Sequence, residues 1–124
     1  MGERGLTLIE VVIALALAGV LGLALVQGLS DMALSQRQHD EQTAALIAAQ
    51  GHIEKIKRAA YDPSVTSAPG PAYLALSTSQ TVGYIPLDLT AIAQLIATDV
   101  QLVTVVASSG GVEILHLQTY KVNR

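Results

Sequence analysis

The chain has 124 residues, no cysteine and a formal net charge of -3, from 7 Lys or Arg and 10 Asp or Glu. This length allows one small domain, and the lack of cysteine excludes disulfides, thiolate zinc sites and a cysteine nucleophile. Hydrophobic residues make up 51% of the chain and aromatic residues only 3%, with no Phe or Trp. A core must therefore be built from Leu, Ile, Val and Ala, and the thinly spread charges give no polybasic nucleic-acid face.

An apolar run begins close to the N-terminus and covers residues 6–26. Its length is close to the roughly 20 residues that a helix needs to cross a bilayer. Only Thr7 and Glu10 are polar within it. A carboxylate inside a membrane is costly and is by default a functional residue with a partner, so Glu10 is the first candidate functional residue.

The helical pattern continues beyond this run. Residues 30–60 contain no proline and one glycine, Gly51, among good helix formers. Apolar residues recur at helical spacing and predict one narrow stripe that docks on a sheet. The members of this stripe are Leu46, Ala49, Ile53, Ile56 and Ala60. We predict a single helix over about residues 6–60, roughly 80 Å long.

Prolines and a glycine in residues 61–71 end the helix and predict a loop. Residues 72–98 leave the strand order open. "YLALS" and "TVGYIPL" are candidate short strands, the second limited by Pro86 to an edge or an end. "LTAIAQLIATD" is a candidate for one or two helical turns that begin near Thr90.

The C-terminal part is easier to interpret. Residues 99–107 are rich in β-branched side chains, "SSGG" (residues 108–111) has the composition of a turn, and residues 112–122 alternate imperfectly. Two such runs around Gly-Gly predict a β-hairpin. The fold class is therefore α+β.

The N-terminal segment allows three interpretations. A secretory signal peptide fits Arg4 and the small residues 16–18, but Glu10 lies in its hydrophobic region and apolar sequence continues past the cut. A plain membrane anchor fits the length and leaves Glu10 unexplained. The third interpretation depends on the residues "GLTLIE" followed by "VVIALALAG".

This sequence closely resembles the N-terminus of type IV pilins and of the pseudopilins of type II secretion. The resemblance implies that a prepilin peptidase cuts between Gly5 and Leu6 and that Leu6 becomes the N-methylated first residue. The family usually has Phe at that position, so Leu6 is a departure. Glu10 falls on the family's glutamate, which the resemblance implies pairs with the N-terminal amine of a neighbouring subunit during assembly.

The resemblance also implies a pilin-like organisation, in which a long N-terminal helix with a membrane-spanning first half packs on a small antiparallel sheet. Residues 1–5 are then the prepilin leader and residues 6–29 the transmembrane and fibre-core half of the helix. Residues 30–60 are its amphipathic continuation, and residues 61–124 a small β-rich globular domain with a terminal hairpin.

Several departures favour a minor pilin or an I-type minor pseudopilin. The chain has no cysteine pair near its C-terminus and no loop like the calcium site of the major pseudopilin. Gln27 and Gly28 stand where major pilins often have a kinking proline. Residues 103–124 are loosely similar to the C-terminal strands of small minor pilins and I-type pseudopilins.

Other candidate sites give weaker signals. His39 and His52 lie roughly 20 Å apart along one helix, too far for one metal ion, so they and His116 are interpreted as surface or edge residues. Lys55, Lys57 and Arg58 lack nearby aromatic stacking partners and are interpreted as a solvated helix edge rather than a DNA-binding patch. We expect no catalytic residue, metal or cofactor.

The predicted function is that of a structural subunit of a type IV pilus or a type II secretion pseudopilus. Its expected partners are the prepilin peptidase, other pilin or pseudopilin subunits, the inner-membrane assembly platform and the membrane, but not nucleic acid. We expect a single-pass inner-membrane protein before assembly and an extracytoplasmic fibre subunit afterwards. The alternatives are a tip adhesin or DNA-uptake pilin, and a signal-peptided exported domain.

Overall fold

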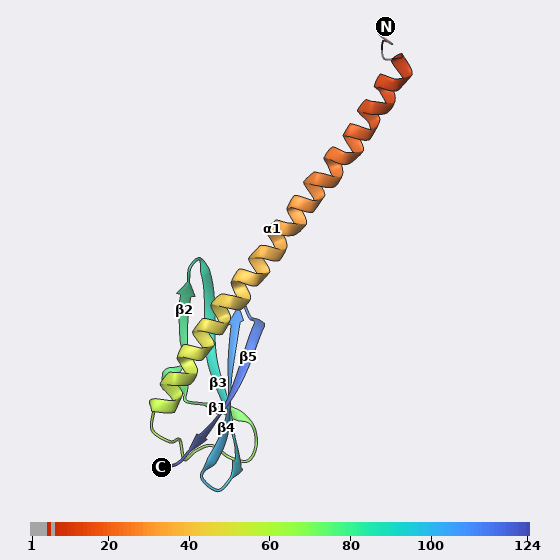
Figure 1. The fold of residues 1–124 in the computed structure, drawn as a ribbon. Helices are drawn as coiled ribbons and strands as arrows, with labels where there is room; N and C mark the ends of the chain where they lie inside the picture. The colour runs from red at the N-terminus through yellow and green to blue at the C-terminus, as the bar shows by residue number, and fades with distance from the viewer. Residues whose placement is uncertain (1–4, 6) are drawn as a thin grey trace. The chain divides into compact units, whose positions relative to one another are not determined.

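The computed structural model describes Gly5 and residues 7–124, which divide into two compact units at the boundary between Gln38 and His39. Helix α1 (Leu8–Arg58) contributes to both units, and every strand belongs to the second (Figure 1). The fold is α+β and pilin-like, with a long N-terminal helix packed on a five-stranded antiparallel sheet. The predicted fold class is confirmed.

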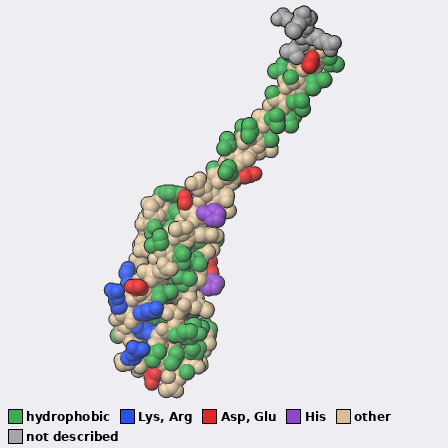
Figure 2. Space-filling model, in the orientation of Figure 1, with side chains coloured by type: hydrophobic (Ala, Val, Ile, Leu, Met, Phe, Trp, Pro, Cys, Tyr) green, Lys and Arg blue, Asp and Glu red, His purple; other side chains and the backbone are tan. Residues whose placement is uncertain are grey.

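The first unit is an apolar stretch of α1 with no buried residue among those described. Large aliphatic side chains are exposed along its length, from Leu8 (84% exposed) to Leu34 (64% exposed), and Figure 2 shows them around the helix. An apolar surface of this extent indicates a membrane or a protein partner. By length and composition, α1 is able to cross a membrane.

The second unit is built around strand β3, which pairs with β4 on one side and with both β1 and β2 on the other. β4 then pairs with β5 at the far edge of the sheet. The strand bounds are β1 (Gly70–Ala72), β2 (Thr78–Val82), β3 (Ile85–Ala97), β4 (Val100–Ser109) and β5 (Val112–Val122). All pairings are antiparallel.

Tight turns join the last four strands. Gly110 and Gly111 connect β4 to β5 and both have positive φ, 58° and 81°. Two consecutive residues with positive φ suit the right-handed twist of a hairpin, and glycine adopts this conformation without steric cost. The predicted terminal hairpin is confirmed.

Three expectations for residues 72–98 are wrong. "LTAIAQLIATD" is not helical, because its residues continue the strand alternation of β3, whose inward side chains are buried from Ile85 to Ala93. "TVGYIPL" is not one strand, since Gly83 (φ 65°) begins a turn between β2 and β3. "YLALS" contains a short 3-10 helix, Leu74–Leu76, instead of a strand.

The helix face that meets the sheet is lined mainly by small residues. The buried residues of α1 are Ala44, Ala45, Ala48, Ala49, His52 and Ile56. The predicted stripe is therefore wrong in part: Leu46 is 38% exposed and Ala60 is exposed beyond the helix end, while Ala49 and Ile56 are in the core. Large sheet residues such as Leu87, Leu89 and Val103 fill the interlayer space, so the helix approaches with its alanines.

His52 departs from the prediction of a surface or edge histidine, because it is only 1% exposed. Neither ring nitrogen has a hydrogen-bond partner among the described residues. Burial, and then the nearby charge of Lys55, lowers the pKa of His52 below its ordinary value of 6.5. The neutral imidazole is therefore the form that fits this core.

This burial predicts a loss of stability in mild acid. Since the pKa of His52 is lower in the folded state, the unfolded state binds more protons below pH 6.5, and stability falls as pH decreases toward the folded pKa. Thermal unfolding of the full chain in micelles at pH 7.5 and pH 5 measures this loss. A His52→Leu variant should lose less stability between the two pH values than the wild type. A His39→Gln variant should lose as much as the wild type, because His39 is exposed. Equal losses in all three proteins would contradict the assignment.

The C-terminal end of α1 is held by a buried lysine from β5. Lys121 is 6% exposed, and its Nζ donates to the carbonyl oxygens of Ile56 at 2.5 Å, Lys57 at 3.2 Å and Ala59 at 2.7 Å. These carbonyls belong to the last turn and exit of α1, where helix geometry leaves acceptors without partners. A cation there also offsets the negative end of the helix dipole.

A second buried network lies beside this lysine. The Tyr73 ring centroid is 5.7 Å from Lys121 Nζ, within cation–π range. The Tyr73 hydroxyl donates to Gln101 Oε1 at 2.5 Å, and Gln101 Nε2 donates to the Asp62 carbonyl oxygen at 2.6 Å. The loop after α1 is thereby tied to strand β4 through polar groups that all have partners.

Candidate assembly site

The candidate site lies at the start of α1, where Thr7 directly precedes the first helical residue, Leu8. The Thr7 carbonyl oxygen accepts hydrogen bonds from the backbone N–H groups of Glu10 at 3.0 Å and Val11 at 3.2 Å. Thr7 Oγ1 also accepts from the Glu10 N–H at 3.4 Å, a long bond. The spacing Thr-x-x-Glu is that of a capping box. This local signal is present in the sequence, but Thr7 was predicted only as a polar residue of the apolar run and not as a helix cap.

Glu10 sits in the first turn of α1, where a carboxylate is favoured by the positive end of the helix dipole. Its side chain is exposed and has no ion-pair partner among the described residues. The next ionisable residue along the helix is Asp31. If the surrounding apolar surface became covered, the Glu10 charge would need a cation supplied from another molecule.

Gly5 is described and exposed, outside regular secondary structure. A Cβ placed on it would meet no heavy atom within 4 Å. Leu6, the other residue of the expected cleavage bond and the expected methylation site, lies outside the described residues. Gly5 is thus accessible itself and lies a few residues before Glu10 in the sequence.

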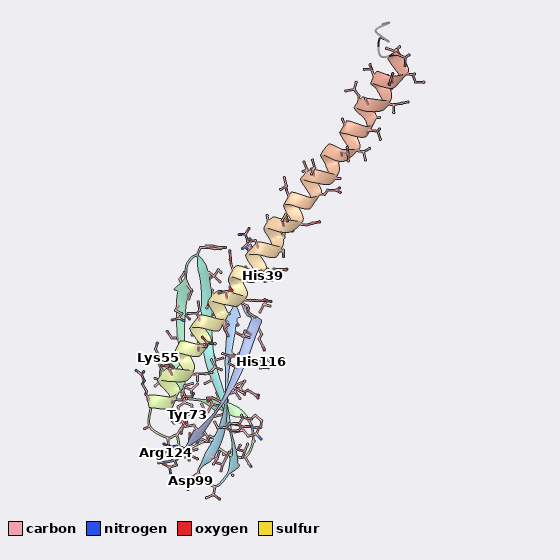
Figure 3. The ribbon with its side chains drawn as sticks, in the orientation of Figure 1. His39, Lys55, Tyr73, Asp99, His116 and Arg124 are labelled. Atoms are coloured by element: carbon pink, nitrogen blue, oxygen red, sulfur yellow. The ribbon has the colours of Figure 1, made fainter. Side chains whose placement is uncertain are left out.

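The other candidate groups form no metal site within the described part of the chain. His39 is exposed, and His116 Nδ1 lies 2.8 Å from Glu113 Oε1. His39 and His116 are labelled on separate elements in Figure 3. Of the predicted basic residues, Arg58 pairs with Glu54 at 3.4 Å on the exposed end of α1.

An apolar helix that has a glutamate in its first turn and packs farther along on a small antiparallel sheet is a pilin-like fold. Residues 1–26 match the family model described as the prokaryotic N-terminal methylation motif, which supports the type IV pilin and pseudopilin family and a precursor of that type. The family that carries this motif is structural rather than enzymatic. No curated protein and no solved structure matches the chain.

Proposed function

We propose that the protein is a structural subunit of a type IV pilus or a type II secretion pseudopilus. The observation that carries the proposal is the methylation motif over residues 1–26 at the head of a long, exposed apolar helix. In this proposal a prepilin peptidase cuts between Gly5 and Leu6, and Leu6 is then N-methylated. The accessible backbone at Gly5 supports cleavage at this position.

Before assembly, α1 anchors the chain once in the inner membrane, and after assembly the same apolar surface lies in the fibre core. The exposed aliphatic residues of the first unit support both states, because lipid and neighbouring helices each remove them from water. Extraction from the membrane requires the assembly platform and other pilin-class subunits as partners. The sheet-bearing unit is then extracytoplasmic.

Glu10 is the proposed docking group. Cleavage after Gly5 creates a new amine at Leu6, and the Glu10 carboxylate of one subunit pairs with the amine of its neighbour. Two opposite charges buried together cost far less than either buried alone, so the pair selects the axial register between subunits. The absence of another charge at residues 7–30 makes Glu10 the one acid there that can fix that register.

A minor subunit is the proposed variety. The features that support it are the lack of cysteine, the absence of a calcium-site-like loop in the sequence, and the loose C-terminal similarity to small minor pilins.

Processing gives the direct test of this proposal. In membranes that contain active prepilin peptidase, intact-mass analysis should find a chain that begins at Leu6 with one added methyl group. A Gly5→Val variant should stay at full length, because its added side chain occupies the residue before the cut, whereas Gly2→Val should still be cut. A chain beginning at Met1 in the wild type, or at Gly19 after signal-peptidase cleavage, would exclude the proposal.

A further inference from the structure

The second unit has its cations at one end only. All five of its Lys and Arg side chains come from the last turns of α1 and the C-terminal part of β5 and the residues after it: Lys55, Lys57, Arg58, Lys121 and Arg124. Figure 2 shows Lys and Arg gathered at one end of this unit. The opposite end of the helical segment carries Asp40 and Glu41 and no Lys or Arg of this unit.

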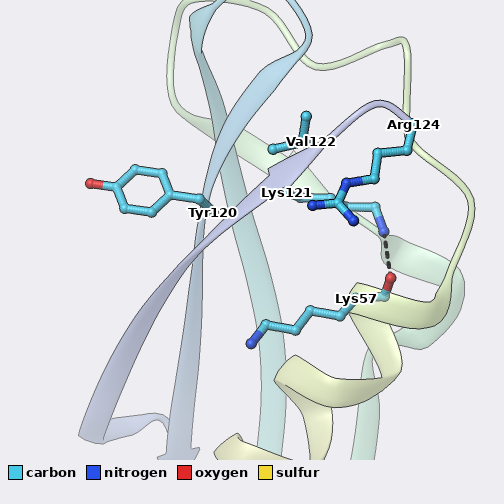
Figure 4. Close-up of a pocket in the computed structure, with 5 residues that line it drawn as sticks. All are labelled: Lys57, Tyr120, Lys121, Val122 and Arg124. Carbon is cyan, nitrogen blue, oxygen red and sulfur yellow. Dashed lines mark hydrogen bonds between the residues drawn. The ribbon is translucent and has the colours of Figure 1, made fainter.

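Three of these cations, Lys57, Lys121 and Arg124, line a hollow of about 310 Å³ (Figure 4). Its lining residues are Lys57, Tyr120, Lys121, Val122 and Arg124, and none of them is acidic. Lys121 is occupied with the carbonyls of α1. Lys57 and Arg124 have no ion-pair partner among the described residues. The hollow therefore offers two charges to an anion from outside the unit.

The acids closest in sequence to this end are already engaged. Glu54 pairs with Arg58 at 3.4 Å, and the Asp62 carboxylate accepts from the Ser64 N–H at 2.9 Å. Asp99 accepts from Asn123 Nδ2 at 3.3 Å, and Figure 3 shows Asp99 and Arg124 at this end. None of these carboxylates lines the hollow, whose charged lining residues are Lys57, Lys121 and Arg124.

We propose that this hollow receives the Asp40 carboxylate of a second copy of the chain, so that copies stack head to tail. Asp40 is exposed, and its one described bond is a long one, 3.4 Å, from the Tyr84 hydroxyl. Arg37 lies four residues before Glu41 on the same helix, a spacing at which opposite charges attract each other. The contact is therefore assigned to Asp40 and not to Glu41. A head-to-tail contact leaves both ends unsatisfied and propagates into a filament rather than closing a dimer.

The inference rests on the proposed function as a fibre subunit and is independent of the minor role. Asp40 and Lys57 are separated by roughly 26 Å along α1 at 1.5 Å per residue. Contacting copies are therefore displaced along the helix axis by about this distance. Charge complementarity at such an exposed contact gives register and specificity more than affinity.

Cross-linking of the chain in sheared fibres tests the contact, since the chain has no native cysteine. Copies still anchored in one bilayer lie at the same height and cannot adopt the axial displacement of about 26 Å. Thr43 and Asp40 line one hollow, so Thr43→Cys places a thiol near Asp40. Val122 lines the basic hollow, so Val122→Cys places a thiol there. The double variant treated with a bismaleimide should give dimers, trimers and longer ladders, whereas each single variant should give no ladder. A double variant that gives no more than the single ones overturns the proposal.

Charge exchange tests the chemistry of the contact. Either Lys57→Glu or Asp40→Lys in the double-cysteine chain should lower ladder yield about fivefold, the size expected of an exposed ion pair, and both together should restore it. The proposal is overturned if the ladder yield stays the same in the charge-exchange variants. It is also overturned if duplex DNA binds at Lys57 and Arg124 and no ladder forms. If the chain is not cut after Gly5, the proposed function fails; if it is cut but gives no ladder, only this inference fails.

Discussion

Replacing Glu10 with Ala should leave membrane insertion and cleavage after Gly5 intact and reduce incorporation into the fibre at least about a hundredfold. The magnitude follows from the 3–5 kcal/mol lost when one partner of a buried ion pair is removed, roughly a factor of ten for each 1.4 kcal/mol. Insertion should not suffer, because Ala is more apolar than a carboxylate. The measurement is the ratio of processed chain in sheared fibre to processed chain in membranes.

Asp31→Ala is the matched control for this variant. Asp31 is also an exposed acid of α1 in the first unit, but it lies beyond the apolar run. Its removal should leave incorporation within about twofold, since exposed charges away from special contacts contribute little. Equal losses for the two variants would show that Glu10 has no specific docking role. Normal incorporation of Glu10→Ala would remove that role altogether.

Replacing Lys121 with Met should destabilise the sheet-bearing unit by about 3 kcal/mol. The Lys121 ammonium donates to three carbonyl oxygens of the α1 terminus, and hydrogen bonds to a charged group each contribute about 1.5–3 kcal/mol. Met fills much of the same volume, so the loss reports the polar contacts more than a cavity. Thermal unfolding of the full chain in micelles, followed by near-ultraviolet signals of its four Tyr, measures the change.

Lys57→Met provides the comparison, because Lys57 lines the same hollow with an exposed side chain. Its removal should change the stability by less than about 0.5 kcal/mol. A Lys121→Met chain as stable as the Lys57→Met chain would show that the carbonyls find water as an adequate partner. The two variants remove the same formal charge, so net charge cannot explain a difference between them.

The elements with strong local signals were predictable from the sequence. The apolar run and the absence of proline through residue 60 predicted α1, which the structure begins at Leu8 and ends at Arg58. Gly110 and Gly111 between β-branched runs predicted the last hairpin, because few other residues accept two consecutive positive φ angles. These features depend on residues that are close together in the sequence, so the local sequence is sufficient to predict them.

β3 was not predictable in the same way. Its alanines and leucines have high helix propensity, and "LTAIAQLIA" contains no turn signal. The strand forms because Leu87, Leu89 and Ala91 face α1 while β2 and β4 complete its hydrogen bonds on both edges. Tertiary context overrides propensity here, as it does commonly for strands.

The face of α1 that packs on the sheet also depends on distant residues. Leu46 and Ile53 both fit a helical stripe, but the bulk of the sheet side chains selects a face centred on alanines and His52. Ile53 is partly buried against the core, whereas Leu46 remains 38% exposed. Lys121 appeared in the sequence as one polar residue of an alternating strand. Its role depends on the end of a helix 62 to 65 residues earlier, which no local pattern indicates.

That separation sets the order in which the protein can fold. α1 forms from local contacts, whereas the Lys121 contacts close a loop of more than 60 residues and carry the entropy cost of non-local pairing. During synthesis the helix emerges well before β5, the final strand that supplies its terminal cap. The sheet-bearing unit can therefore complete its fold only after β5 has emerged and paired with β4, so a chain arrested earlier would expose an uncapped helix end.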